Sequence, residues 1–289
     1  MLDVVQISYQ ETFADDNFEL LKLFAPHAKR IEGVKGIFNA HKAAAEIAET
    51  SHFYVVDADA VIAEEFSFKF KPNANRFMWE TVPETDCVFV WRSRNPVNDL
   101  LYGYGGAKLF PRKKMLNATD WRVDMTTTIG CPFVPKFQVS NITQFNTTPY
   151  ETWKSAFREC AKLSSAIIPN GDNLDNQYRL KTWQTKGAKR PFGEWSLLGA
   201  KQGADFGYTY KDKPNVLNYI NDFEILVGND NIDRFIDSGF TGINNNRIKY
   251  INNTLSSSNS LTNSLNTLSF TIISSDNSYL LYSLSLLSK

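Results

Sequence analysis

A short apolar run that stops at two carboxylates constrains this chain more than any other feature of its sequence. Residues 52–57 read His-Phe-Tyr-Val-Val-Asp, and Ala58 and Asp59 follow directly. Continuous apolar runs rich in β-branched and aromatic residues are typical of a strand covered on both faces of a parallel sheet. Ligands collect beyond the carboxyl ends of such strands, so we expect Asp57 and Asp59 to lie at a functional site.

The two carboxylates favour a divalent cation. Side chains alternate along a strand, so Asp57 and Asp59 can lean the same way while Ala58 leaves room. No Lys or Arg lies between residues 53 and 68 to neutralise them. Mg²⁺ or Mn²⁺ typically binds one or two protein carboxylates together with phosphate oxygens. We therefore predict a metal-bound diphosphate, with Asp57 and Asp59 as metal ligands; the alternative is a chance pair, because a lone D-x-D is common.

The residues before this strand predict a parallel sheet. A strand is expected at 4–9, a helical stretch near 17–24, a short strand at 29–31 and an Ala-rich helix near 39–49. This β-α-β-α-β order with short connections is typical of helical crossovers between parallel strands. The predicted fold class is α/β, with a mostly parallel open sheet flanked by helices.

In this order of elements the chain resembles the GT-A class of nucleotide-sugar glycosyltransferases. The resemblance covers residues 4–110 well and 111–210 loosely, and its matching pieces are residues 7–9, 30–33, 36–40 and 53–59. It implies a Rossmann-like, donor-binding half over 1–110 and an acceptor half over 111–244. It also implies Mn²⁺ or Mg²⁺ as cofactor, and donor contacts from Ser8, Tyr9, Arg30, Asn39, His41 and Ala58.

The positions of the histidines do not identify a third metal ligand. The chain has three histidines, His27, His41 and His52, and all precede the D-x-D. Many GT-A enzymes add a C-terminal histidine as a third ligand, and this chain has none there. Water and diphosphate could complete the shell, Asp205 could substitute, or metal dependence could be weak. For His41 the alternative to a nucleotide contact is a histidine on the helix surface.

A glycine-containing block follows the D-x-D strand. Residues 87–96 predict a strand leading into a polar turn, and Gly103, Gly105 and Gly106 follow. Residues 104–109 look like the GT-A loop between donor sugar and acceptor, which implies site residues Arg92, Arg94, Tyr104, Gly105, Gly106 and Lys108. The alternative is a hairpin turn that simply needs flexible residues.

This block is also basic and aromatic, which suggests an anionic acceptor. Its cations are Arg92, Arg94, Lys108, Arg112, Lys113, Lys114 and Arg122, interleaved with Trp91, Tyr102, Tyr104 and Trp121. Such a cluster could meet diphosphate or a nucleic-acid backbone, or it could be a solvated face. The block resembles glycosyltransferase-like proteins of tailed phages, some of which decorate hydroxymethylated bases in DNA. That resemblance implies modified DNA as acceptor, with a glycan as the alternative.

Two acidic residues are candidates for the catalytic base. Residues 148–163 predict an amphipathic helix that carries Glu159 beside its apolar face. Asp172 opens the next predicted helix and loosely resembles the acidic helix start that supplies an acceptor-side carboxylate in many GT-A enzymes. We favour Asp172 over Glu159 if the reaction inverts; the alternative for Asp172 is a plain helix cap.

Composition bounds the remaining possibilities. The 31 basic and 31 acidic residues cancel, so no global field draws the chain to nucleic acid or to a membrane. Three cysteines without metal-like spacing, no signal-peptide pattern and no membrane-length apolar stretch predict a cytoplasmic protein, in the host cytoplasm if the gene is carried by a phage. Residues 245–289 read as a low-complexity, weakly ordered tail, or alternatively as strands at 268–273 and 279–284.

Together these features predict a metal-dependent glycosyltransferase with a nucleotide-sugar donor. A nucleotidyltransferase is the enzymatic alternative, although residues 8–16 lack the Gly, Arg or Lys of a phosphate loop. The third alternative is a non-catalytic sugar- or nucleic-acid-binding module. It would be favoured if Asp57 and Asp59 were splayed apart or neutralised by Arg or Lys.

Overall fold

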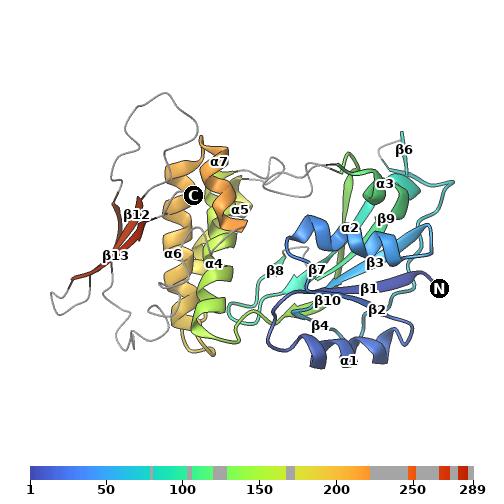
Figure 1. Cartoon of the computed structure of the whole chain (residues 1–289), viewed down its shortest axis with the longest axis horizontal. Helices are drawn as coiled ribbons and strands as arrows, with labels where there is room; N and C mark the ends of the chain where they lie inside the picture. Colours follow the sequence, from blue (N-terminus) through green and yellow to red (C-terminus); the bar gives the residue numbers. More distant parts are fainter. Residues whose placement is uncertain are drawn as a thin grey trace. The chain divides into compact units, whose positions relative to one another are not determined.

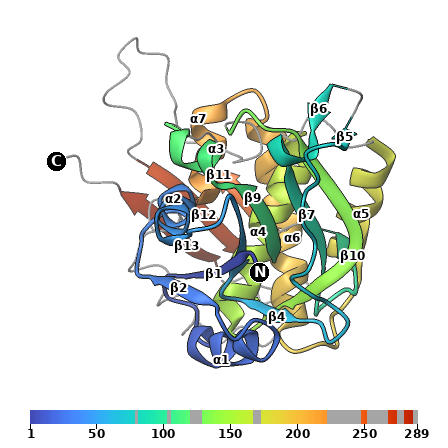
Figure 2. The same cartoon turned by 90° about the vertical axis from the view of Figure 1, so that its right-hand side faces the viewer.

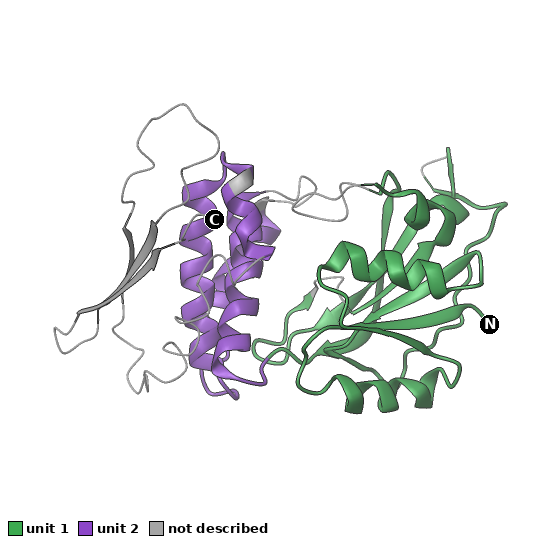
Figure 3. Ribbon diagram, viewed as in Figure 1, with its two compact units in different colours: residues 1–145 green, residues 146–289 purple. Residues whose placement is uncertain are grey.

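The chain forms two compact units in this computed structural model, residues 1–145 and residues 146–289, coloured separately in Figure 3. We describe each unit by itself. The residues that the structure describes are 1–78, 81–102, 106–119, 129–166, 173–221, 247–251, 267–273 and 279–285.

The predicted β-α-β-α-β order opens the first unit. Its elements are β1 (Asp3–Ser8), α1 (Ala14–Phe24), β2 (Lys29–Glu32), α2 (Ile37–Ile47) and β3 (His52–Asp57). Strand β1 pairs in parallel with β2 on one side and with β3 on the other. Helices α1 and α2 cover opposite faces of these strands, as Figures 1 and 2 show. The prediction of parallel strands with helical crossovers is therefore confirmed.

Strands β1 and β3 are buried on both faces, and this explains the apolar run of β3. All six residues of β1 are buried, and their side chains divide between two cores. Val5 and Val55 belong to the core under α2, whereas Val4 and Val56 belong to the core under α1. Since side chains alternate along a strand, a strand with a core on each face has no solvent-facing side, and even the polar Gln6 of β1 is buried.

Further strands extend the sheet beyond β3. They are β4 (Ala60–Ile62), β7 (Val88–Arg94), β8 (Leu101–Tyr102), β9 (Ala107–Pro111) and β10 (Phe133–Thr143). The strand order is β2-β1-β3-β9-β7-β10-β4, and β8 pairs with β7. Five of the seven strands in this path run the same way, and β9 and β4 are antiparallel to their neighbours. The sheet is thus mostly parallel in strand direction, and the expected boundary at residue 110 lies within its central strand β9.

Strand direction defines two edges of the sheet. Strands β1, β3, β7 and β10 end at one edge, which we call the carboxyl edge, and β9 begins there because it runs the opposite way. The D-x-D follows β3 at this edge. Strand β9 ends at the other edge, the amino edge, where the short helix α3 (Arg112–Asn117) follows it. A small hairpin of β5 (Phe77–Met78) and β6 (Val82–Pro83) and a 3-10 turn (Glu84–Asp86) precede β7.

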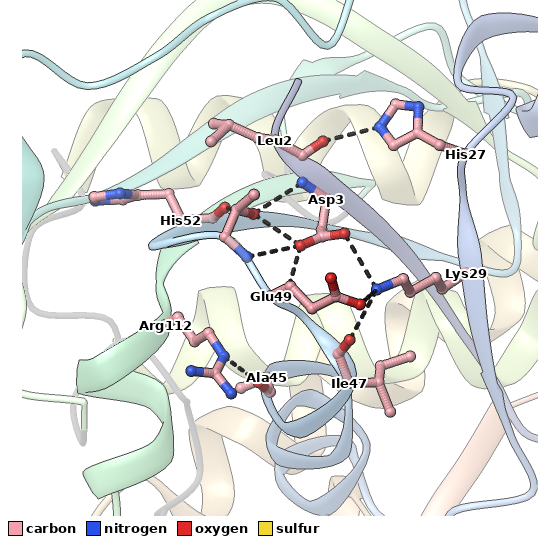
Figure 4. A network of polar contacts seen from close by, with 10 residues as sticks. Leu2, Asp3, His27, Lys29, Ala45, Ile47, Glu49, His52 and Arg112 are labelled. Atoms are coloured by element: carbon pink, nitrogen blue, oxygen red, sulfur yellow. Dashed lines mark hydrogen bonds and ion pairs between the residues drawn. The ribbon is translucent and has the colours of Figure 1, made fainter.

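Asp3 organises the amino edge (Figure 4). Its carboxylate accepts hydrogen bonds from the backbone N–H groups of Glu49 at 2.7 Å and Thr50 at 2.8 Å and from the Thr50 hydroxyl at 2.9 Å. The Lys29 ammonium lies 3.4 Å from it. Burial raises the pKa of Asp3, but these hydrogen bonds and the charge of Lys29 outweigh burial and bring it to about 2.

The second unit is built on helices that approach one another closely. They are α4 (Pro149–Ser165), α5 (Asn173–Thr185), α6 (Gly193–Tyr210), α7 (Pro214–Leu217) and a 3-10 turn (Asn218–Asn221). Gly199, Gly203 and Gly207 recur every fourth residue of α6 and lie against α4. A Cβ atom on Gly203 would overlap the carbonyl oxygen of Phe157. Glycine at this spacing therefore sets how closely the two helices pack.

The C-terminal region contains three strands that pair in an antiparallel sheet. They are β11 (Arg247–Ile251), β12 (Thr267–Ile273) and β13 (Tyr279–Ser285). Strands β12 and β13 coincide with the two segments that the sequence offered as an alternative to a structureless tail. Within the described part of the chain, no helix combines the length and apolarity needed to cross a bilayer.

Candidate functional site

The D-x-D lies where the sequence predicted it, directly after a buried strand at the carboxyl edge. Asp57 is the last residue of β3, and β4 begins at Ala60. Asp57 and Asp59 are both partly exposed, whereas Ala58 between them is buried. Both residues therefore lie at the edge where the parallel strands end, and the side chain of Asp57 is 25% exposed there.

Asp57 has a cationic partner, Lys108, which was among the predicted site residues but was not expected to neutralise Asp57. The Lys108 ammonium donates to both carboxylate oxygens of Asp57, at 2.8 Å each. Lys108 lies on β9 opposite Val55, and the residue is 8% exposed. The expectation that no basic residue neutralises the acids was therefore wrong for Asp57, because it considered only residues 53–68. Strand pairing brings in a lysine from 51 residues further along the chain.

Asp59 remains in a field of negative charge. Burial, followed by the charges of Asp57 and Glu11, raises the pKa of Asp59 well above its ordinary value, and the charge of Lys108 opposes this rise. The Glu11 carboxylate is itself held at the end of β1, where it accepts from the Tyr9 backbone N–H at 2.8 Å. The carboxyl groups of Asp57, Asp59 and Glu11 thus repel one another at the carboxyl edge, and a cation near Asp59 would reduce this repulsion.

A buried asparagine fixes the turn that carries the D-x-D. The Asn17 side chain, on α1, donates to the Ala58 carbonyl at 2.9 Å and to the Gln144 side-chain oxygen at 3.0 Å. The Gln144 backbone N–H donates to the Asp59 carbonyl at 2.6 Å. The turn is therefore tied to α1 and to the end of β10. Sequence reasoning missed Asn17, although its signal was present: it is a polar residue between Ala14 and Leu21 on the buried face of α1.

Gly106 packs beside Asp57 without space for a side chain. Its carbonyl accepts from the Asp57 backbone N–H at 3.1 Å, and its own N–H donates to the Ser93 hydroxyl at 3.2 Å. The Asn141 side-chain oxygen accepts from the hydroxyls of Ser93 at 3.0 Å and Ser140 at 2.7 Å. A Cβ on Gly106 would overlap the Asn141 side chain. Gly106 is thus required by packing against Asn141. Tyr104 and Gly105 lie outside the described residues.

The predicted donor residues Ser8, Tyr9 and Arg30 reach the same edge. The Arg30 guanidinium donates to the Ser8 hydroxyl at 2.9 Å and contacts Asp15 at 2.5 Å. The Tyr9 side chain follows β1 and is 41% exposed. The hydrogen bond between Ser8 and Arg30 orients both side chains, while the exposed Tyr9 side chain could contact a ligand.

The two predicted donor residues on α2 differ sharply in exposure. Asn39 is exposed and donates to the Lys35 carbonyl at 3.2 Å. His41 is fully buried, contacts the Phe110 ring edge-on and bonds the Ile37 carbonyl through Nδ1 at 2.7 Å. Burial, followed by the charge of Lys108, lowers the pKa of His41 to about 3. His41 is therefore neither a surface histidine nor accessible to a nucleotide; it is a neutral core residue.

The fold divides the predicted basic block between two edges. Arg92 and Arg94 lie near the end of β7 at the carboxyl edge, whereas Arg112 follows β9 at the amino edge and bonds the Ser51 carbonyl through its backbone N–H. The five residues of β9 separate the two groups by about 17 Å. Trp91 is buried, so it cannot stack on a ligand. The basic residues that are clustered in the sequence therefore do not form one cluster in the fold; Trp121 and Arg122 lie outside the described residues.

The predicted catalytic acids are not joined to this site by the described structure. Asp172 lies outside the described residues. Glu159 lies half-buried on α4, beside the predicted apolar face whose members Trp153, Phe157 and Cys160 are buried. Glu159 and Asp205 both belong to the second unit.

The donor atoms at the carboxyl edge suit a cation that is shared with a substrate. Among the described residues, no three or more His, Cys, Asp or Glu side chains form a group that could hold a metal ion. Asp57 and Asp59 supply hard oxygen donors, and Mg²⁺ is commonly held by one or two carboxylates together with substrate phosphates. These two residues fit such an ion, provided that Asp57 exchanges its contact with Lys108.

No known family model matches this chain, and no curated protein matches its sequence.

Proposed function

We propose that this protein is a glycosyltransferase of the GT-A type, which transfers a sugar from a nucleotide diphosphate to an acceptor hydroxyl with the help of Mn²⁺ or Mg²⁺. The observation that supports it most is the position of Asp57 and Asp59 directly after β3, at the carboxyl edge of a mostly parallel sheet. In open α/β sheets this edge is where nucleotides bind. The order of elements from β1 to β3 is consistent with the same class of enzyme.

The proposal assigns roles to residues of the first unit. Asp57 and Asp59 would hold the divalent ion, which when bound supplies positive charge for the leaving diphosphate. Asn17 keeps the D-x-D turn in one conformation through the Ala58 carbonyl. Lys108 supplies a second cation at the same place. The base that accepts the proton of the acceptor hydroxyl would be Asp172, on the strength of the resemblance, or else Glu159, which lies beside the apolar face of α4.

The acceptor in this proposal is a hydroxyl of a glycan or of a hydroxymethylated base in DNA. Arg92 and Arg94 are the basic residues of the original block that lie at the carboxyl edge without a carboxylate partner among the described contacts. The Arg92 guanidinium stacks on the exposed Phe137 ring, 4.7 Å from its centroid. An anionic acceptor would meet these residues, and Arg112, Lys113 and Lys114 would not contribute.

A screen of nucleotide sugars tests the proposed function without knowledge of the acceptor. Each nucleotide sugar is incubated with the protein and Mn²⁺, and slow release of the nucleoside diphosphate is followed together with thermal stabilisation. We expect at least one donor to be hydrolysed in a metal-dependent way. Absence of both hydrolysis and stabilisation across the set would contradict the proposal.

The contact between Lys108 and Asp57 favours a second candidate function, a non-catalytic module that binds a phosphorylated sugar or nucleotide. A carboxylate already neutralised by lysine has less need of a metal ion. This candidate predicts metal-independent binding of a nucleotide sugar and no turnover. The same screen separates the two functions, because only a transferase releases diphosphate.

A further inference from the structure

Lys108 occupies the place that a cation bound to Asp57 would take. Its ammonium contacts both oxygens of the carboxylate at 2.8 Å, and its side chain is 10% exposed. We propose that Lys108 makes divalent-ion binding at Asp57 and Asp59 depend on the nucleotide diphosphate. This inference rests on the proposed function and adds a positioning residue to it.

Charge explains the dependence. A divalent ion that approaches Asp57 in the free protein meets the Lys108 ammonium, which is a charge of the same sign in a mostly buried position. Releasing Lys108 from Asp57 leaves a buried ammonium without its partner, and such a change is costly. A diphosphate removes the conflict, because its oxygens accept from Lys108 and ligate the ion at the same time.

The backbone around Lys108 restricts the change to the side chain. Strand β9 pairs with β3 on one side and with β7 on the other, so Lys108 has Val55 and Val90 as its neighbours. Gly106, just before it, is packed against Asn141. A central strand held on both sides cannot move away, whereas a lysine side chain can rotate toward a new anion. Lys108 is thus fixed at its base and adjustable at its ammonium.

The charge near Asp59 shows why the ion would still be attracted. Asp59 follows Asp57 at the same edge, and the single Lys108 ammonium, which contacts the Asp57 carboxylate, can neutralise only one of these two negative charges. With Lys108 in place, the site attracts a cation weakly. With Lys108 redirected to a diphosphate, its charge no longer opposes an ion at the two aspartates, so ion and diphosphate each strengthen the binding of the other.

Equilibrium dialysis of Mn²⁺ against the full chain tests this coupling. The wild type is compared with Lys108→Gln, which removes the charge, and with Lys108→Arg, which keeps it. Each protein is measured alone and with UDP, GDP, CDP, dTDP or ADP in parallel. Lys113→Gln, an exposed lysine at the amino edge, is the matched control.

We expect wild type to bind Mn²⁺ at least about tenfold more tightly in the presence of one of the diphosphates. Lys108→Gln should bind Mn²⁺ alone about tenfold more tightly than wild type and lose most of the coupling. Lys108→Arg and Lys113→Gln should behave like wild type. If Lys108→Gln does not fold, Lys108→Met is measured in the same way, since its apolar side chain suits a buried position.

The outcomes separate this inference from the proposed function. Coupled binding of Mn²⁺ and a diphosphate by wild type, with unchanged Mn²⁺ affinity in the uncharged Lys108 variants, overturns the role of Lys108 alone. Absence of Mn²⁺ binding by every protein under every condition overturns both the inference and the metal-dependent function.

Discussion

Asn17→Ala should loosen the D-x-D turn and lower the stability of the first unit. Asn17 is 4% exposed and donates to the Ala58 carbonyl and the Gln144 side chain. Ala58 is 1% exposed, so its carbonyl would lose its partner where water cannot easily replace it. An orphaned buried acceptor costs about 1–3 kcal/mol. Gln144 is half-buried and can turn to water, so it adds little, and we expect a loss of about 1–3 kcal/mol in the free energy of unfolding.

Urea denaturation followed by circular dichroism measures this loss. Asn17→Asp is the informative companion, because a carboxylate of the same shape would face two acceptor oxygens and add charge beside Asp59. It should destabilise more than Asn17→Ala. Asn39→Ala, which removes an exposed amide from α2, should change stability by less than about 0.5 kcal/mol. If both Asn17 variants unfold like wild type, the turn does not depend on Asn17 and this reasoning is refuted.

Three further predictions follow from the described contacts. Gly203→Ala on α6 should cost about 2 kcal/mol or more in urea denaturation, because the new methyl group overlaps the Phe157 carbonyl and the helices must separate. Asp3 has a folded-state pKa of about 2 and an unfolded one near 3.9, so its stabilisation is complete above about pH 4 and is lost as pH falls toward 2. Asp3→Asn should be less stable than wild type at pH 7, and its free energy of unfolding should fall less than that of wild type between pH 4 and pH 2. An equal fall in both proteins would contradict this. Replacing Arg112, Lys113 and Lys114 together by Ala should leave donor hydrolysis and the salt dependence of acceptor binding unchanged, whereas Arg94→Ala should reduce that salt dependence.

The sequence predicted the first half of the sheet because its signals there are local. Strand β3 is a continuous apolar run, its helices have Ala-rich or amphipathic periodicity, and short connections leave parallel pairing as the simple solution. The location of Asp57 and Asp59 followed from the same reasoning, since a D-x-D after a buried parallel strand must emerge at the carboxyl edge.

The surroundings of the D-x-D depend on strand pairing that local patterns do not encode. Strand β9 enters the sheet antiparallel between β3 and β7, and this reversal takes Lys108 to Asp57 and Arg112 to the opposite edge. Lys108 and Arg112 are near neighbours in the sequence, yet they lie at opposite edges of the sheet. The close contact of Gly106 with Asn141 likewise joins strands β9 and β10 across a gap of 35 residues in the chain. The glycine spacing in α6 was readable from the sequence and was overlooked.

The measurement that tests the central claim most directly compares Mn²⁺-dependent release of nucleoside diphosphate by wild type, Asp59→Asn and Glu46→Gln. Glu46 is an exposed acid on α2, so its variant controls for the loss of one negative charge. If Asp59 helps to hold an ion against the leaving diphosphate, Asp59→Asn should fold normally and lose about 100-fold or more in rate, whereas Glu46→Gln should match wild type. Near-full hydrolysis by Asp59→Asn with Mn²⁺ present would contradict the account.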